Sequence, residues 1–156
     1  MADNDVQTKQ GGARVGVPPP LVFAAAILIG AFLPDLRPRV WLSAPPGAVL
    51  MVLGAALMGW ALNWFRRTGQ NPNPRLPSPE LIERGPYRFM RNPMYVGLTL
   101  LTLGIGGLLA RGWIALLAPA ALIAVHYLAV LPEERYLTAK FGESYVLYKT
   151  RVRRYL

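Results

Sequence analysis

The sequence contains no cysteine and few charged residues. The absence of cysteine excludes disulfides, catalysis by a thiolate and zinc sites with cysteine ligands, and no metal site is predicted. Charged residues make up 16% of the chain, against roughly 25% in an average soluble domain. Most of the hydrophobic residues lie in four blocks, with the charges between them. This segregation predicts an integral membrane protein.

Acidic residues are also scarce, which leaves the chain strongly basic. Eight Asp and Glu residues stand against 17 Lys and Arg, for a formal net charge of +9. Nucleic-acid-binding proteins show a similar balance. Here the basic residues flank the apolar blocks, so we expect membrane lipids with anionic headgroups as partners and no nucleic acid.

The four apolar blocks predict about four transmembrane helices. A span needs roughly 20 apolar residues, so the first block is short. Gly47, Gly54 and Gly59 in the second block are small residues that let membrane helices pack closely. We therefore expect an all-α, polytopic membrane bundle in one domain of residues 18–156, with its spans at residues 18–33, 45–65, 94–110 and 113–131.

Polar segments flank and separate these blocks. Residues 1–17 are polar and Gly-rich, which predicts a disordered N-terminal tail. Residues 66–91 contain five prolines, which argues against a continuous helix. An irregular segment of this length in a small protein is usually functional or disordered. Residues 133–156 alternate charges with aromatics and predict a C-terminal amphipathic helix at the membrane interface.

Two polar clusters are predicted to meet at one end of a helical hairpin. A short turn at residues 111–112 joins the third and fourth blocks, so their far ends lie on the same membrane face. One cluster covers residues 85–97 and the other residues 132–145. Adjacent carboxylates there, Glu133 and Glu134, are costly unless they are paired or hydrated. The sequence predicts a polar interfacial pocket for a zwitterionic ligand beside a lipophilic one.

The order and spacing of these pieces resemble a known family. The first cluster reads Gly-Pro-Tyr-Arg-x-x-Arg-Asn-Pro-Met-Tyr-x-Gly from Gly85. After the hairpin follow Glu-Glu-x-x-Leu from Glu133 and Phe-Gly-x-x-Tyr-x-x-Tyr from Phe141. Over residues 69–152 this arrangement resembles the isoprenylcysteine carboxyl methyltransferases and the related phospholipid N-methyltransferases.

The resemblance implies a methyltransferase that uses S-adenosyl-L-methionine without a Rossmann fold, and that acts on a lipophilic small molecule or a lipidated substrate. This agrees with the absence of a strand followed by a G-x-G-x-x-G motif. Glu133 is implied near the ribose or the amino-acid end of the cofactor. The full set of residues that the resemblance places at the cofactor is Leu81, Ile82, Tyr87, Asn92, Pro93, Tyr95 and Glu133.

Two positions depart from the carboxyl methyltransferases. That family usually has His at the position of Asn92, and an Arg that handles substrate in its eukaryotic members falls near Ala129. The Asn-Pro-Met-Tyr form also occurs in phospholipid methyltransferases. We expect an isoprenylcysteine carboxyl methyltransferase-like activity, with N-methylation of phosphatidylethanolamine as the alternative. An alternative of another class is a non-enzymatic membrane scaffold or a transporter subunit.

Arg91, His126 and Glu134 are candidate substrate contacts. Arg91 could instead anchor a span at the interface. His126, the only histidine, lies seven residues before Glu133 on roughly the same helix face. It either accepts a proton from a substrate amine or hydrogen-bonds to a neighbouring helix. Glu134 points about 100° away from Glu133 and contributes less to binding if it faces solvent.

Simpler structural roles compete with site roles at other positions of the two clusters. Asn92 and Pro93 are predicted to start a helix, with Asn92 as its cap and Pro93 at its first position. Cofactor contact is compatible with that role. Tyr145 and Tyr148 more often belong to an aromatic interfacial belt than to a site.

The distribution of Lys and Arg predicts the topology. The N-terminal tail has two, the 66–91 segment six and the C-terminal segment six, against two and one in the short connectors. The positive-inside rule then places both termini in the cytoplasm. Reporter fusions at Arg37 and at Leu156 are expected to lie on opposite faces of the membrane. Both reporters on one face would contradict the four-span topology.

Overall fold

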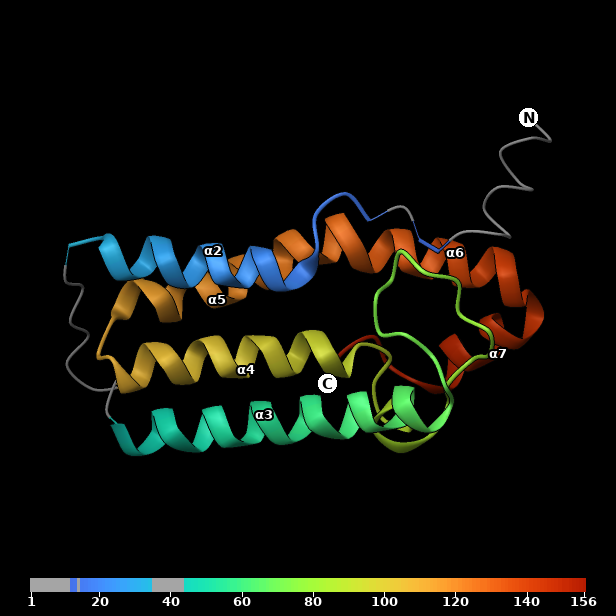
Figure 1. The fold of residues 1–156 in the computed structure, drawn as a ribbon, viewed down its shortest axis with the longest axis horizontal. Coiled ribbons are helices and arrows are strands. Elements are labelled where there is room, and N and C mark those ends of the chain that lie inside the picture. Colours follow the sequence, from blue (N-terminus) through green and yellow to red (C-terminus); the bar gives the residue numbers. More distant parts are fainter. Residues whose placement is uncertain (1–11, 14, 35–43) are drawn as a thin grey trace.

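The computed structural model describes residues 12, 13, 15–34 and 44–156. They form a bundle of four long helices with a loop-rich end (Figure 1). Within these residues there is no β-strand, and Met90 and Arg153 form an isolated bridge. The prediction of an all-α fold is confirmed. The helices are α2 (Pro19–Phe32), α3 (Ala44–Arg67), η1 (Gly85–Arg88), α4 (Pro93–Leu108), α5 (Gly112–Val125), η2 (His126–Val130), α6 (Leu131–Phe141) and α7 (Glu143–Arg151).

Helix α4 lies at the centre of the arrangement. It packs against α3 on one side and against α5 on the other, and α2 packs on α5. The four long helices run side by side along the long axis, and the 68–84 loop, α6 and α7 gather at one end (Figure 1). Both polar clusters belong to this end.

Glycines allow α3 and α4 to approach closely. A Cβ atom on Gly54 would lie 2.7 Å from the carbonyl oxygen of Gly97, and one on Gly47 would lie 2.9 Å from that of Gly104. Each pair is seven residues from the next, so one stripe of each helix faces the other. The packing role predicted for Gly47 and Gly54 is confirmed. Gly59 has no neighbour that its Cβ would meet within 4 Å, so it has no such role.

Among the residues that the structure describes, two helical stretches are long and apolar enough to cross a membrane, Ala44–Arg67 and Gly112–Phe141. Only 11% and 33% of their most apolar stretches are buried inside the protein. A core helix of a soluble protein would be mostly buried, so these outward apolar surfaces suit lipid. Pro19–Phe32 and Pro93–Leu108 are apolar but shorter.

The helix of the fourth apolar block contains one π turn near its predicted end at residue 131 and then continues as α6 to Phe141. The π turn, His126–Val130, comes directly before Pro132. Proline has no N–H to donate to the carbonyl four residues earlier, and a π turn accommodates the misfit by taking up one extra residue. The extra residue rotates the following helix, α6, about its axis relative to the orientation it would have in an unbroken α-helix. The expectation that His126 and Glu133 share a helix face is therefore wrong, because it assumed unbroken α-helical spacing.

The prediction of a single amphipathic helix over residues 133–156 is also wrong. Helix α6 ends at Phe141, and Gly142 has a φ of +56°, a conformation that favours glycine and turns the chain. After α7, residues 152–156 leave the helix and return beside Met90, and these five residues are called the C-terminal segment below. The last residues of the chain therefore lie against the loop-rich end of the bundle.

The described part of the predicted N-terminal tail packs on the 68–84 loop. The amide of Ala13 donates to the carbonyl of Pro74 at 2.7 Å, and the guanidinium of Arg75 donates to the carbonyls of Val15 and Gly16. Ala13 and Val15 are buried. Residues 1–11, 14 and 35–43 lie outside the described residues, and with them the connector arginines on which the topology prediction partly rests.

The glycine contact between α3 and α4 can be tested with alanine. Gly54→Ala is expected to lower stability by about 1–3 kcal/mol, the usual cost of overpacking, because the added methyl meets backbone. Gly59→Ala is the matched control on the same helix and is expected to be neutral or stabilising, since Ala favours helix over Gly by about 1 kcal/mol. Thermal unfolding in detergent measures both. Equal stability of the two variants would contradict the close approach.

Candidate functional site

The loop-rich end encloses a cavity of about 420 Å³. Small-molecule sites commonly have volumes of roughly 300–1,000 Å³. The 68–84 loop, η1, the start of α4, α6 and α7 all contribute to its wall. The two polar clusters therefore meet as predicted. Nine of the ten candidate site residues line this cavity, namely Leu81, Ile82, Tyr87, Arg91, Asn92, Pro93, Tyr95, Glu133 and Glu134.

The wall of the cavity has an apolar part beside the polar part. Met58 comes from α3, Met94 and Leu98 come from α4, and Leu137 comes from α6. Val15 and the prolines at residues 18–20 complete it, although no sequence signal had connected them with the site. A ligand in this cavity would contact charged groups and hydrocarbon together.

Glu133 is fixed by a tyrosine across the helical hairpin. The hydroxyl of Tyr95 donates a 2.9 Å hydrogen bond to Oε2 of Glu133. Pro93 starts α4, which places Tyr95 in the first turn, and Glu133 lies in the first turn of α6. A carboxylate accepts up to about four hydrogen bonds. Glu133 thus lines the cavity in a fixed orientation and keeps capacity to accept from a ligand.

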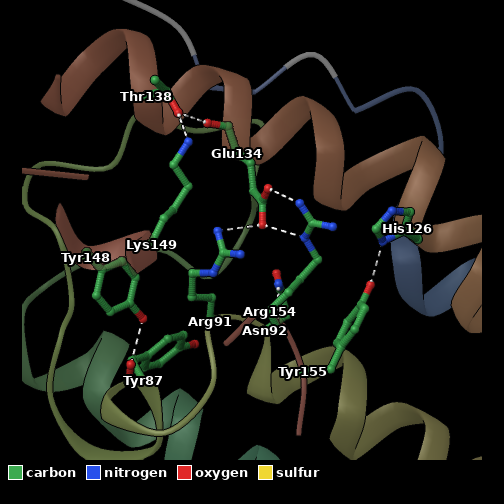
Figure 2. A network of polar contacts seen from close by, with 10 residues as sticks. All are labelled: Tyr87, Arg91, Asn92, His126, Glu134, Thr138, Tyr148, Lys149, Arg154 and Tyr155. Atoms are coloured by element: carbon green, nitrogen blue, oxygen red, sulfur yellow. Dashed lines mark hydrogen bonds and ion pairs between the residues drawn. The ribbon is translucent and has the colours of Figure 1, made fainter. Parts of the chain in front are cut away.

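Glu134 is buried in an ion cluster. Arg154 donates from Nε and Nη2 to the two carboxylate oxygens at 2.9 and 2.8 Å, and Nη1 of Arg91 lies 2.9 Å from Oε1 (Figure 2). The residue is 9% exposed. The condition under which Glu134 would contribute less, exposure to solvent, is not met, because the C-terminal segment folds over this face of α6.

The same C-terminal segment engages the start of α4. The amide of Arg91 donates to the carbonyl of Arg153 at 2.9 Å, and Nδ2 of Asn92 donates to the carbonyl of Arg154 at 3.1 Å. Pro93 opens the helix as predicted, but the side chain of Asn92 makes no capping hydrogen bond. Asn92 therefore occupies the predicted N-cap position, but its side-chain amide holds the returning chain and does not cap the helix.

Three tyrosines form a buried wall of the site. Tyr87, Tyr145 and Tyr148 line the cavity, and the hydroxyl of Tyr148 donates to the carbonyl of Tyr87 at 2.6 Å (Figure 2). Burial raises the pKa of Tyr145 to about 12 and also raises the pKa values of Tyr87 and Tyr148. All three stay neutral at physiological pH. Assigning Tyr145 and Tyr148 to an interfacial belt is wrong, because both are buried.

His126 does not line the cavity. Its Nδ1 lies 3.0 Å from the hydroxyl of Tyr155, so the imidazole contacts the C-terminal segment (Figure 2). Of the two roles predicted for His126, a hydrogen bond is the one observed, although its partner is not a neighbouring helix. The phase change at the π turn accounts for its distance from the site.

Sequence reasoning missed two residues of this region, Arg154 and Gln70. Arg154 looked like part of a solvated amphipathic helix. The adjacent acids at Glu133 and Glu134 were the available signal, because a buried carboxylate requires a cationic partner. Gln70 is buried, lines the cavity and donates to the carbonyl of Glu80 at 3.1 Å. No motif marked it. Among the described residues, no group of three or more His, Asp or Glu side chains is placed to hold a metal ion.

Comparison with protein families places most of the chain in a known family. Residues 43–144 match the profile of the phospholipid methyltransferase family, which covers more than half of the chain. The matched region includes α3, the 68–84 loop, the hairpin of α4 and α5, and α6. It stops before Tyr145 and before the C-terminal segment. A comparison with curated proteins finds no match.

The ion cluster at Glu134 can be tested by removing its charge. Glu134→Gln is expected to destabilise the protein by about 3 kcal/mol, because it leaves two guanidinium groups without their anion. Glu143→Gln, an exposed acid in the first turn of α7, is the control and is expected to lose less than about 1 kcal/mol. Unfolding curves in detergent compare the two. Equal losses would show that the cluster contributes nothing to stability.

Proposed function

The chain belongs to the phospholipid methyltransferase family, and from this premise we propose that it is a membrane-embedded methyltransferase that uses S-adenosyl-L-methionine and methylates a lipophilic acceptor. One observation carries the proposal. Residues from the loop, from the start of α4 and from α6 line a single cavity that has both polar and apolar walls. This is the surface that a polar methyl donor and a lipid acceptor need in common.

The residues present fit the proposed methyl donor. Leu81, Ile82 and Tyr87 offer apolar and aromatic surface for an adenine ring. The carboxylate of Glu133 accepts hydrogen bonds from ribose hydroxyls or from an α-ammonium group. Tyr95 keeps that carboxylate in place through its 2.9 Å hydrogen bond. When bound, S-adenosylmethionine supplies an electrophilic methyl group on a sulfonium.

Methyl transfer of this kind depends on alignment more than on acid–base catalysis. Holding two reactants in line replaces an encounter in solution by a step between fixed partners. The fixed carboxylate of Glu133 orients one ligand, and the apolar wall around Met58, Met94 and Leu98 receives hydrocarbon and excludes water. The neutral hydroxyls of the buried tyrosines add donors without adding charge. An amine acceptor attacks as the neutral amine, so its ammonium form must first give up a proton, to solvent or to a basic group at the cavity wall.

We propose that α2, α3, α4 and the α5–α6 helix all cross the membrane, with both termini in the cytoplasm. Helices α2 and α4 have 14 and 16 residues, which corresponds to lengths of about 21 and 24 Å. A hydrocarbon core of roughly 30 Å must thin locally around them or be spanned with the help of flanking residues. The outward apolar surfaces of the two longer helices support this arrangement.

For the acceptor we propose the amine of a phospholipid such as phosphatidylethanolamine. The family match supports it. Ala129, at the place where eukaryotic carboxyl methyltransferases are expected to carry a substrate-binding Arg, is fully buried and does not line the cavity. The carboxyl group of an isoprenylcysteine is the second candidate, favoured by the motif from Phe141 to Tyr148, of which Tyr145 and Tyr148 line the cavity.

The proposal predicts binding of the demethylated product. S-adenosylhomocysteine at 100 times its dissociation constant is expected to stabilise the purified protein by about 2.7 kcal/mol. Glu133→Gln should weaken this binding by about tenfold or more, because hydrogen bonds to charged groups contribute roughly 1.5–3 kcal/mol. Glu143→Gln should bind like the wild type. Calorimetry and thermal unfolding give the affinities and the shifts.

A transfer assay then distinguishes the two acceptors. Protein in phosphatidylcholine vesicles, with or without phosphatidylethanolamine, receives methyl-labelled S-adenosylmethionine, and a parallel sample receives an isoprenylcysteine analogue. Label in the phosphatidylethanolamine fraction is the expected outcome. Label only in the analogue would favour the second candidate. Neither labelling nor binding of S-adenosylhomocysteine would favour a non-enzymatic scaffold.

A further inference from the structure

Arg91 lines the cavity with a guanidinium group whose hydrogen bonds are incomplete. Its side chain is 10% exposed. Nε and Nη1 are buried and have no hydrogen-bond partner among the described residues. The 2.9 Å approach of Nη1 to Glu134 is an ion pair, but its geometry does not make a hydrogen bond. A buried donor left in this state is costly, which makes a missing partner the natural explanation.

Charge counting around Glu134 leads to the same conclusion. Arg154 already donates two hydrogen bonds to the two oxygens of this carboxylate. One anion therefore serves two cations, Arg154 and Arg91. The neighbouring acid, Glu133, hydrogen-bonds to Tyr95 instead. The ion cluster of Glu134, Arg91 and Arg154 thus carries one excess positive charge, and Arg91 is the member with unused donors at the cavity wall.

We propose that Arg91 is the anion receptor of the cavity and binds an oxyanion of the bound ligands. This inference rests on the proposed function and deepens it. The planar guanidinium fork matches the geometry of a carboxylate or a phosphate. Two ligands offer that chemistry, the methyl donor through the carboxylate of its amino-acid part and the phospholipid acceptor through its phosphate. Either one neutralises the excess charge and completes the donors of Arg91.

A purely structural role for Arg91 predicts the opposite effect on the empty protein. If Arg91 mainly stabilised the fold through Glu134, then Arg91→Gln would lower the unfolding temperature of the ligand-free protein. As an anion receptor Arg91 is an undercompensated buried cation, so its removal leaves Glu134 in a balanced pair with Arg154. The unfolding temperature without ligand is then expected to stay the same or to rise, while ligand-induced stabilisation falls.

Three variants test the proposal. Arg91→Gln removes the charge. Arg91→Lys keeps the charge but cannot donate two parallel hydrogen bonds as a guanidinium group does. Arg88→Gln is the matched control, because Arg88 is exposed, packs over the ring of Phe89 and does not line the cavity. Calorimetry measures binding of S-adenosylhomocysteine and of 5′-methylthioadenosine, which lacks the amino-acid part. The transfer assay gives KM and kcat for phosphatidylethanolamine.

Two outcomes support the proposal and identify the anion. If the carboxylate is bound, Arg91→Gln weakens S-adenosylhomocysteine by roughly 10- to 100-fold and leaves 5′-methylthioadenosine unchanged. If the phosphate is bound, S-adenosylhomocysteine binds normally and the KM for phosphatidylethanolamine rises by a similar factor with kcat retained. In either case Arg91→Lys lies between the wild type and Arg91→Gln.

Two other outcomes overturn it. If the wild type binds S-adenosylhomocysteine, and neither Arg91→Gln nor Arg91→Lys differs from Arg88→Gln in affinity or KM, this inference fails and the proposed function stands. If the wild type binds no S-adenosyl compound and transfers no methyl group, the proposed function fails and the inference fails with it. An Arg91→Gln protein that does not fold, beside an Arg91→Lys protein with wild-type affinity and KM, would assign Arg91 a structural role.

Discussion

The site depends on the ion pairs that the buried carboxylate of Glu134 makes with Arg91 and Arg154. It lies on α6, and its two cationic partners come from the segment before α4 and from the end of the chain. Because a carboxylate in this position requires compensation, the C-terminal segment must return across the mouth of the bundle. That return then fixes Asn92 through the Arg154 carbonyl and His126 through Tyr155. One ionised group thereby organises three parts of the chain that are distant in sequence.

The molecule has two regions held together by different forces. Along the bundle, α3 and α4 meet through glycine backbones, and such contacts rely on van der Waals packing, because lipid is as apolar as the helices themselves. At the loop-rich end, ion pairs and side-chain hydrogen bonds dominate. The cavity lies in this second region but is bordered by side chains of the first, such as Met58 and Leu98. The combination of polar and apolar walls in one cavity follows from that position.

The sequence predicts well what depends on local composition. The apolar blocks predict the first and last residues of α3 and α4 closely. Proline marks the start of a helix at Pro93, and glycine marks the contact between α3 and α4. The lining of the cavity was also predictable in large part, since the two-residue turn forces Tyr95 and Glu133 to the same end. Their roles toward a ligand stay a prediction.

The features that the sequence could not predict depend on the rotational phase of a helix and on contacts between residues that are distant in the sequence. A hydrophobic pattern does not reveal a π turn, so His126 was placed on the wrong face. Nothing local connects Arg154 to Glu134 or Asn92, because their pairing is a property of the folded chain. The π turn also makes the site sensitive to chain length. Loss of a single residue between Gly112 and Val130 would turn α6 by about 100° and carry both glutamates away from their partners. Insertions and deletions in this stretch of helix would therefore move both glutamates relative to α4, whereas substitutions keep their register.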